Sequence, residues 1–150
     1  MSLKYELPEF LADTVSQERY ERWLGRKAIA QLKRDRRRGN TSATREEYRL
    51  EIHRAVTGSG GRDAYTGEEL AWNLISKYDN RESQARGRSY KHEFGLLPTV
   101  DHLGDGTGPP DFVICSWRTN DGKHDLAVDE FLALCQRVLE HHGCTVRKDS

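Results

Sequence analysis

The fold is decided by residues 98–123, which read PTVDHLGDGTGPPDFVICSWRTNDGK. Within them, residues 99–103 and 112–115 are short apolar runs that favour strands. The Gly- and Pro-rich residues 104–110 form a loop, and a loop of this length joins the two strands as an antiparallel pair. A brief helical turn is expected near residues 120–123. The stretch therefore predicts an α+β fold built on two strands followed by a helix.

Residues that carry chemistry stand where these elements end. Asp101 and His102 close the first strand, and Asn120 begins the helical turn after the second. Neighbouring strand residues point to opposite faces, so Asp101 and His102 can share a site only where the strand ends or bulges, and the following loop supplies such an ending. The oxygens of Asp101 and Asn120 suit a single Mg²⁺ or Mn²⁺ ion. His102 suits the role of general base, because an unperturbed imidazole titrates near working pH.

These residues resemble the HNH endonucleases, the treble-clef branch of the ββα-metal nucleases. The family pattern has Asp-His closing one strand, Asn opening the next, and His or Asn nine residues later, with Lys three residues after that. In this chain the pattern falls on Asp101, His102, Asp111, Asn120 and Lys123. The resemblance implies a metal-dependent cut in DNA that leaves 5′-phosphate and 3′-hydroxyl ends.

The resemblance covers about residues 62–140, and the chain departs from the family pattern in two respects. Asp111 replaces Asn, which keeps the acceptor and loses the amide donor, so Asp111 is expected to hold the loop or to orient the His102 ring. The residues aligned with the four zinc-binding cysteines are Asp63, Thr66, Ser116 and Thr119. No structural zinc is therefore expected. The treble clef would instead be held by packing of Trp72, Phe94, Phe112, Trp117 and Phe131.

The first 58 residues lie outside the resemblance and are expected to form a helical basic arm. Residues 14–38 have helical spacing of apolar side chains, and the capping box Thr44–Glu47 begins a second helix. The run Gly58–Gly61 contains only glycine and serine, which predicts a flexible joint. The expected division is a basic arm at residues 1–58 and an HNH-like domain at residues 62–150.

The formal net charge is zero, but the charge is unevenly distributed. Residues 26–38 contain seven cations and one anion, a local charge of +6, whereas residues 89–150 contain six cations and ten acids, a charge of −4. A basic helix beside an acidic, metal-binding region is expected to grip DNA through its phosphates, without reading its sequence. The residues expected to contact nucleic acid are Lys33, Arg34, Arg36, Arg37 and Arg38 on the helix, with Arg118 and Lys123 near the site.

The remaining segments are expected to support this core. Residues 68–76 predict a short helix, and the polar residues 79–93 predict a basic loop. The final helix is expected over residues 127–141, with its apolar stripe buried in the core. The stripe consists of Val128, Phe131, Leu132, Leu134, Cys135, Val138 and Leu139.

Several classes of protein are excluded by composition. No run approaches the ~18 apolar residues of a membrane span, and the N-terminus lacks the apolar region of a signal peptide, which argues against a membrane or secreted protein. The three cysteines have no framework spacing, which suits a reducing cytoplasm. Oligomeric state is left open.

Three functions are compatible with these features. The first is the HNH-type endonuclease acting on DNA. The second is a non-catalytic module that binds nucleic acid, since zinc ligands and the family Asn are missing. The third is a protein–protein adaptor with a helical interaction surface. The basic helix is also compatible with an ordinary solvated face.

Overall fold

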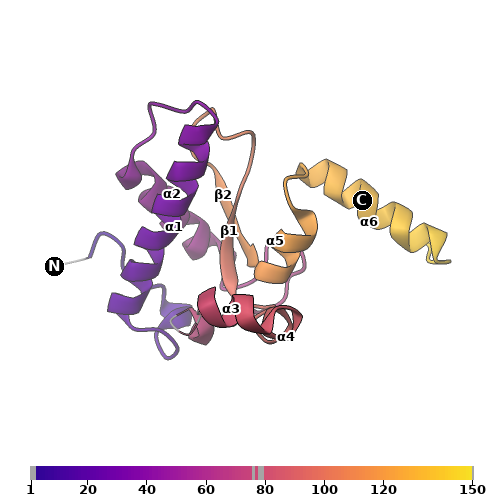
Figure 1. Ribbon diagram of the computed structural model, residues 1–150, viewed down its shortest axis with the longest axis horizontal. Coiled ribbons are helices and arrows are strands. Elements are labelled where there is room, and N and C mark those ends of the chain that lie inside the picture. Colours follow the sequence, from indigo (N-terminus) through magenta and orange to yellow (C-terminus); the bar gives the residue numbers. More distant parts are fainter. Residues whose placement is uncertain (1–2, 76, 78–79, 150) are drawn as a thin grey trace.

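A computed structural model describes residues 3–75, 77 and 80–149 of the chain. It has an α+β fold with two antiparallel strands and helices around them (Figure 1). The elements, in chain order, are η1 (Glu9–Leu11), α1 (Gln17–Arg37), α2 (Arg45–Ser59), η2 (Trp72–Leu74), α3 (Asn80–Arg86), α4 (Arg88–Glu93), β1 (Pro98–His102), β2 (Phe112–Ser116), α5 (Trp117–Lys123) and α6 (Val128–His141).

The expected strand pair is confirmed. Strands β1 and β2 are antiparallel, with Val100 opposite Ile114 and His102 opposite Phe112. The loop between the strands is closed by the Leu103 amide, which donates to the Asp111 carbonyl at 2.8 Å. Strand β1 therefore ends at His102, at the edge where the loop departs.

The sheet lies between two sets of helices. Helices α1 and α2 pack on one side of the strands, and α5 lies on the other (Figure 1). The large side chains that fill the core come from both the helices and the strands: Tyr20, Trp23, Leu24, Tyr48, Ile52 and Val56 from the helices, and Val100, Phe112 and Ile114 from the strands. Segments 1–58 and 62–150 thus contribute to the same apolar core.

The chain between these segments is closely packed. Thr44 caps α2 as expected, because the Glu47 amide donates to Thr44 Oγ1 at 3.2 Å. The Thr44 hydroxyl in turn donates to Glu47 Oε1 at 2.9 Å, which is half of the expected capping box with a side-chain contact in place of the other half. Helix α2 continues to Ser59, beyond the expected end before Gly58. Gly61 has φ +83°, and a Cβ there would lie 3.1 Å from the Phe10 ring, so this position requires glycine for both conformation and space. The run expected to be a flexible joint is a helix end in contact with Phe10.

The helix expected over residues 68–76 is largely wrong. The described part contains only the single turn of η2, and Ser76 lies outside the described residues. Two backbone hydrogen bonds hold the preceding residues in an extended form: the Leu70 amide donates to Gly61 and the Ala71 amide donates to Leu96. Pairing with distant segments therefore outweighs the local helical pattern.

The loop expected over residues 79–93 is also wrong, except for residue 79, which lies outside the described residues. This segment forms α3 and α4, separated by Gly87 with φ +56°. Tyr90 is fully buried and stacks on Phe94 with ring centroids 4.3 Å apart. Tyr90 and Phe94, one helical turn apart, anchor the otherwise polar α4 to the core. One apolar pair is too short a pattern to predict a helix from hydrophobic spacing alone.

The final helix has the expected bounds, but its expected burial is wrong. Helix α6 projects away from the rest of the molecule (Figure 1, right), and none of its residues is buried. Leu132 and Val138 are 55% and 51% exposed. Of the aromatic residues expected to hold the core by packing, Trp72, Phe94 and Phe112 are buried.

Candidate active site

The two polar residues at the end of strand β1 contact different neighbours. Asp101 is 2% exposed; its Oδ2 accepts a hydrogen bond from the Tyr65 hydroxyl at 2.6 Å and forms an ion pair with Lys123 Nζ at 3.0 Å. Its neighbour His102 faces α1 instead. The alternation of the strand therefore persists through His102, and in the described part of the chain no hydrogen bond joins the Asp101 carboxylate to the His102 imidazole.

The ion pair between Asp101 and Lys123 joins β1 to α5. Both side chains are at most 4% exposed, so each charge is removed from water and depends on the other for compensation. The Tyr65 hydroxyl adds a third group, and burial together with Asp101 raises the pKa of that phenol well above its usual range. The Asp101 carboxylate is thus already paired with one cationic group.

Asn120 lies on the same side of α5 as Lys123. The two residues are three apart in a helix, a spacing that places side chains one above the other on one face. Because Lys123 reaches Asp101, this face of α5 is turned toward β1. Asn120 is thereby brought to the same end of the sheet as Asp101.

The His102 imidazole meets two arginines of the N-terminal helical region. Its Nε2 lies 2.5 Å from Arg34 Nη2 and 3.2 Å from Arg38 Nη1. Guanidinium groups only donate hydrogen bonds, so Nε2 must act as the acceptor, which assigns a neutral ring with its proton on Nδ1. That Nδ1 is buried and has no hydrogen-bond partner among the described residues.

Arg34 and Arg38 carry positive charge that the described residues leave without an ion-pair partner. Neither side chain forms an ion pair with a carboxylate in the described part of the chain. Burial, and after it the charge of Arg38, lowers the pKa of Arg34 from its ordinary value. Two cations that share one neutral imidazole favour the approach of an anion.

Two adjoining hollows connect these side chains. One, of about 410 Å³, is lined by His102, Lys123 and Arg38 together with the start of α6. The other, of about 300 Å³, is lined by Arg34, Arg38, Asn120 and residues after α5. Arg38 borders both hollows. The imidazole and the lysine line the first hollow, and the Asn120 amide lines the second. Asp101 lines neither and contacts Lys123 at the first.

The other predicted residues lie outside these hollows. The Asp111 side chain is exposed, and because His102 Nδ1 has no partner, the expected hydrogen bond from the ring to Asp111 is absent. Only the Asp111 backbone holds the loop, through Leu103. Arg118 is bound to Glu68, which raises the pKa of the guanidinium. The other cations expected to contact nucleic acid are exposed and line neither hollow: Lys33, Arg36 and Arg37.

The loop after His102 is fixed by the end of α1. Asn40 Nδ2 donates to the Gly106 carbonyl at 2.9 Å. Gly106 has φ +85°, and a Cβ there would lie 2.5 Å from Asp35 Oδ1, so glycine is required for this close approach. Asp35 is itself buried and accepts a hydrogen bond from the Tyr48 hydroxyl. The same helix that supplies Arg34 and Arg38 therefore positions the loop that ends β1.

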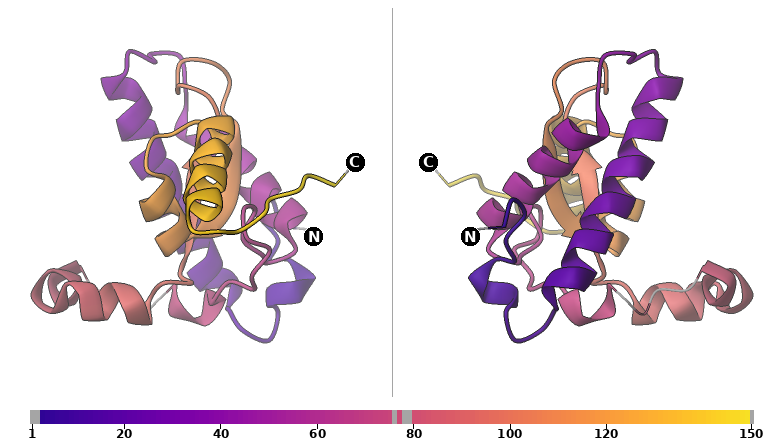
Figure 2. Two further views of the ribbon diagram at one scale, coloured as in Figure 1. Left: turned by 90° about the vertical axis from the view of Figure 1, so that its right-hand side faces the viewer. Right: turned by 90° about the vertical axis from the view of Figure 1, so that its left-hand side faces the viewer.

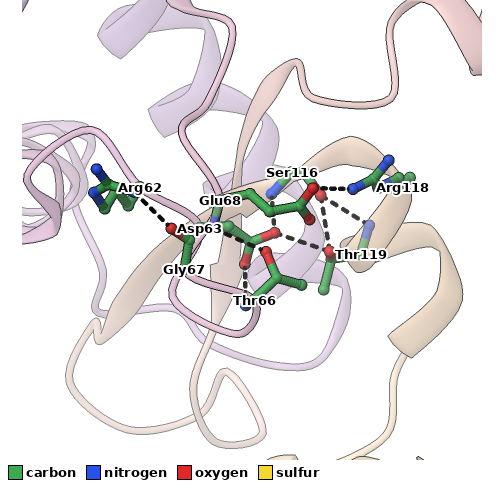
Figure 3. A network of polar contacts seen from close by, with 8 residues as sticks. All are labelled: Arg62, Asp63, Thr66, Gly67, Glu68, Ser116, Arg118 and Thr119. Atoms are coloured by element: carbon green, nitrogen blue, oxygen red, sulfur yellow. Dashed lines mark hydrogen bonds and ion pairs between the residues drawn. The ribbon is translucent and has the colours of Figure 1, made fainter.

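The buried carboxylate of Asp63 holds together the four positions that were aligned with zinc-binding cysteines (Figure 3). Asp63 is 2% exposed; its Oδ1 accepts from the Tyr65 and Thr66 amides at 2.8 and 3.3 Å. Its Oδ2 accepts from the Ser116 amide at 3.1 Å and the Thr119 hydroxyl at 2.8 Å. Burial alone would raise the pKa of Asp63, but these hydrogen bonds outweigh it and lower that pKa. This network ties the turn at residues 63–66 to the β2–α5 junction.

The sequence contained part of this information. All four positions aligned with zinc ligands, Asp63, Thr66, Ser116 and Thr119, take part in the network, although packing alone was expected there. Two local signals were available in the sequence. Asp63 stands four residues before Gly67, which is typical of a turn, and Ser116 directly precedes a helix, which is typical of an N-cap. The contact of Tyr65 with Asp101 and that of the arginines with His102 had no local signal.

Whether a metal ion suits this site depends on the ligand atoms that its side chains offer. Asp101 and Asn120 offer hard oxygens of the kind Mg²⁺ and Mn²⁺ prefer, and Asp101 already attracts a cation. Over residues 3–75, 77 and 80–149 no group of three or more His, Cys, Asp or Glu side chains is gathered in a way that would hold an ion. An ion held by Asp101 and Asn120 alone would keep most of its water ligands, and Lys123 now occupies the carboxylate.

Searches against family models, curated proteins and solved structures gave no match. Among the described residues, no helix combines the length and the apolar character that crossing a membrane requires.

Proposed function

We propose that this protein is a divalent-metal-dependent endonuclease of the HNH type, which hydrolyses phosphodiester bonds in DNA. The observation that carries the proposal is the meeting of His102 with Arg34 and Arg38 beside the hollow that Lys123 lines. Hydrolysis of a phosphodiester needs a base for the attacking water and positive charge around the phosphate. These side chains supply both kinds of group.

Binding of substrate would rearrange the hydrogen bonds of His102. A DNA phosphate is a stronger acceptor for guanidinium than a neutral imidazole is, so it would take over Arg34 and Arg38. Their departure frees Nε2 of His102, which in this structure accepts from both. A free Nε2 on a neutral ring accepts a proton from water, which is the action of a general base.

The residues that would hold Mg²⁺ or Mn²⁺ are Asp101 and Asn120. Such an ion would stabilise the negative charge on the departing 3′ oxygen. Lys123 now neutralises Asp101, so it has to turn away when Asp101 binds a dication. Lys123 also lines the hollow beside His102, where its ammonium group would meet the phosphate.

One observation favours the second candidate, a module that binds nucleic acid without cutting it. The Lys123 ammonium already compensates Asp101, and the pair is buried. If the lysine is not displaced, the arginines still bind phosphate and no metal-dependent step follows.

The experiment that separates these functions uses supercoiled plasmid and the full chain. An endonuclease produces nicked or linear plasmid with Mg²⁺ or Mn²⁺ and none with EDTA. A binding module retains DNA in a salt-dependent way and leaves the plasmid intact in every metal. Failure to bind DNA at low salt would contradict both and would favour the protein–protein adaptor.

A matched pair of variants tests the role of Arg34 and Arg38. The double variant Arg34→Ala/Arg38→Ala is expected to cut saturating DNA about 100-fold more slowly, because both donors to the reacting phosphate are lost. The control Arg36→Ala/Arg37→Ala removes the same charge from the same region, where the side chains are exposed.

Both double variants should weaken DNA binding and reduce its salt dependence by a similar amount, since each removes two phosphate contacts. Only the first should slow cleavage of saturating DNA. Equal slowing of cleavage in the two variants would contradict a specific role for Arg34 and Arg38.

The cytoplasm is the compartment that we propose. All three cysteines are free, and Cys144 is exposed, which suits reducing conditions.

A further inference from the structure

Helix α6 presents an apolar face that the rest of the chain leaves uncovered. The first turn is anchored to the molecule by Phe131, whose ring lies 6.2 Å from the Tyr65 ring, centroid to centroid. Beyond that contact, Leu132, Leu134, Val138 and Leu139 are 45–55% exposed. A helix of 14 residues is marginally stable in water unless its apolar face is packed. The exposed face therefore points to a binding partner.

The apolar residues of α6 follow the spacing of a helix-pairing seam. Six apolar residues recur every three or four positions along the helix: Val128, Phe131, Leu132, Cys135, Val138 and Leu139. A seam of this width over four turns fits another helix with the same kind of face.

The charges around the seam select the direction of that partner. Acidic residues gather at the N-terminal end of the helix: Asp125, Asp129 and Glu130. At the other end of the helix the charges of Arg137 and Glu140 cancel, beside His141 and His142. The segment after the helix is weakly basic, because Arg147 and Lys148 outnumber Asp149. An antiparallel copy of α6 separates the two acidic N-terminal ends, places each near the weakly basic segment of the other copy and opposes the helix dipoles. A parallel copy brings the two acidic ends together.

The position of α6 allows this arrangement. The helix leaves the body at its N-terminal end and extends away from it (Figures 1 and 2). In an antiparallel pair the two bodies lie at opposite ends of the paired helices, so they do not collide. A parallel pair would force both bodies to the same end.

We propose that α6 is the interface of a homodimer, in which it packs antiparallel on α6 of a second copy of this chain. The twofold axis crosses the middle of the helix, so each copy offers the same surface to the other. The start of α6, at Ala127 and Val128, lines the hollow that contains His102. The dimer therefore places the weakly basic C-terminal segment of one copy beside the hollow of the other.

The mass of the full chain in solution tests the dimer. Sedimentation equilibrium of the wild-type protein should give twice the chain mass of 17.3 kDa at micromolar concentration. Leu132→Glu places two charges in the seam of each dimer and should raise its dissociation constant by at least about 30-fold. The control Ala133→Glu introduces the same charge at an exposed position on the opposite face of the helix and should leave the dimer intact.

A wild-type chain that is monomeric at all concentrations would overturn the proposal. A Leu132→Glu variant that dimerises as tightly as Ala133→Glu would also overturn it. Helix content measured by circular dichroism confirms that each variant is folded before its mass is interpreted.

Disulfide formation tests the antiparallel direction. Val128→Cys, made in a chain that has Cys135→Ser and Cys144→Ser, should not form a covalent dimer, because the two copies of residue 128 lie at opposite ends. Addition of His142→Cys should allow rapid crosslinking between position 128 of one copy and position 142 of the other. Crosslinking through Val128→Cys alone would overturn the antiparallel arrangement.

Discussion

Replacement of His102 by alanine should lower the rate of metal-dependent plasmid nicking by about 10²- to 10⁴-fold, the usual contribution of a general base. The ring accepts hydrogen bonds from Arg34 and Arg38 at 2.5 and 3.2 Å, so its removal leaves the two guanidinium groups in place. DNA affinity should therefore be retained or slightly increased in His102→Ala. The measurement is the initial nicking rate at saturating DNA with Mg²⁺ or Mn²⁺, beside an affinity measured in EDTA.

His92→Ala is the matched control for this variant. His92 is an exposed histidine of α4 and lines neither hollow near His102. Its variant should nick plasmid at the wild-type rate. Equal nicking by His102→Ala and wild type would show that the cleavage has another source or another base, and the proposed role of His102 would be wrong.

Replacement of Asp63 by alanine should lower the free energy of unfolding by about 3 kcal/mol, because buried donors are left without an acceptor. Those donors are the amides of Tyr65, Thr66 and Ser116 and the hydroxyl of Thr119. The effect should reach the candidate active site as well, since Tyr65 is also hydrogen-bonded to Asp101. The measurement is chemical denaturation followed by circular dichroism.

Asp63→Asn separates shape from charge. The amide has nearly the same shape as the carboxylate but has only one acceptor oxygen, so its NH₂ group must face two of the donors. Its loss of stability should approach that of the alanine variant. Asp13→Ala, at an exposed position, is the control and should change the free energy of unfolding by less than about 0.5 kcal/mol. A similarly small effect in Asp63→Ala would contradict the structural role of the network.

The contribution of Asp63 should depend on pH in a defined direction. Its hydrogen bonds keep the folded-state pKa below the ordinary value of about 3.9 for an unfolded Asp. A group with a lowered folded-state pKa stabilises the protein fully above its unfolded pKa, and this stabilisation is lost as the pH falls through the folded value. The difference in Tm between wild type and Asp63→Ala should therefore be constant from about pH 5 to pH 7 and should shrink below about pH 4. A difference that grows on acidification would contradict this assignment.

Local patterns in the sequence were sufficient to predict several elements. Residues 98–123 gave the antiparallel strands, because strand runs and a Gly- and Pro-rich loop act within a few residues of one another. The helix after them was predicted only in part, since α5 begins at Trp117 and not at Asn120. The Thr44 cap of α2 and the bounds of α6 were predicted from similarly local signals. The sequence also placed Asp101 and Asn120 on the elements that carry them.

The same local patterns gave wrong predictions where distant segments compete. Residues 68–76 have a helical pattern, but amide hydrogen bonds from Leu70 to Gly61 and from Ala71 to Leu96 hold the residues before η2 extended. The α6 stripe has the spacing of a buried face, and spacing records that a face is apolar without recording what covers it.

By itself, the sequence determined which residues could perform chemistry and on which elements they stand, because those choices depend on residue type and near neighbours. Only the tertiary structure decided their partners. Arg34 meets His102 across 68 positions of sequence, and Asp63 meets Thr119 across 56, since the helices pack on the sheet and bring these segments together. The physical reason is that a side chain's direction on its own element is a local property, whereas the group that it faces is set by how the elements pack.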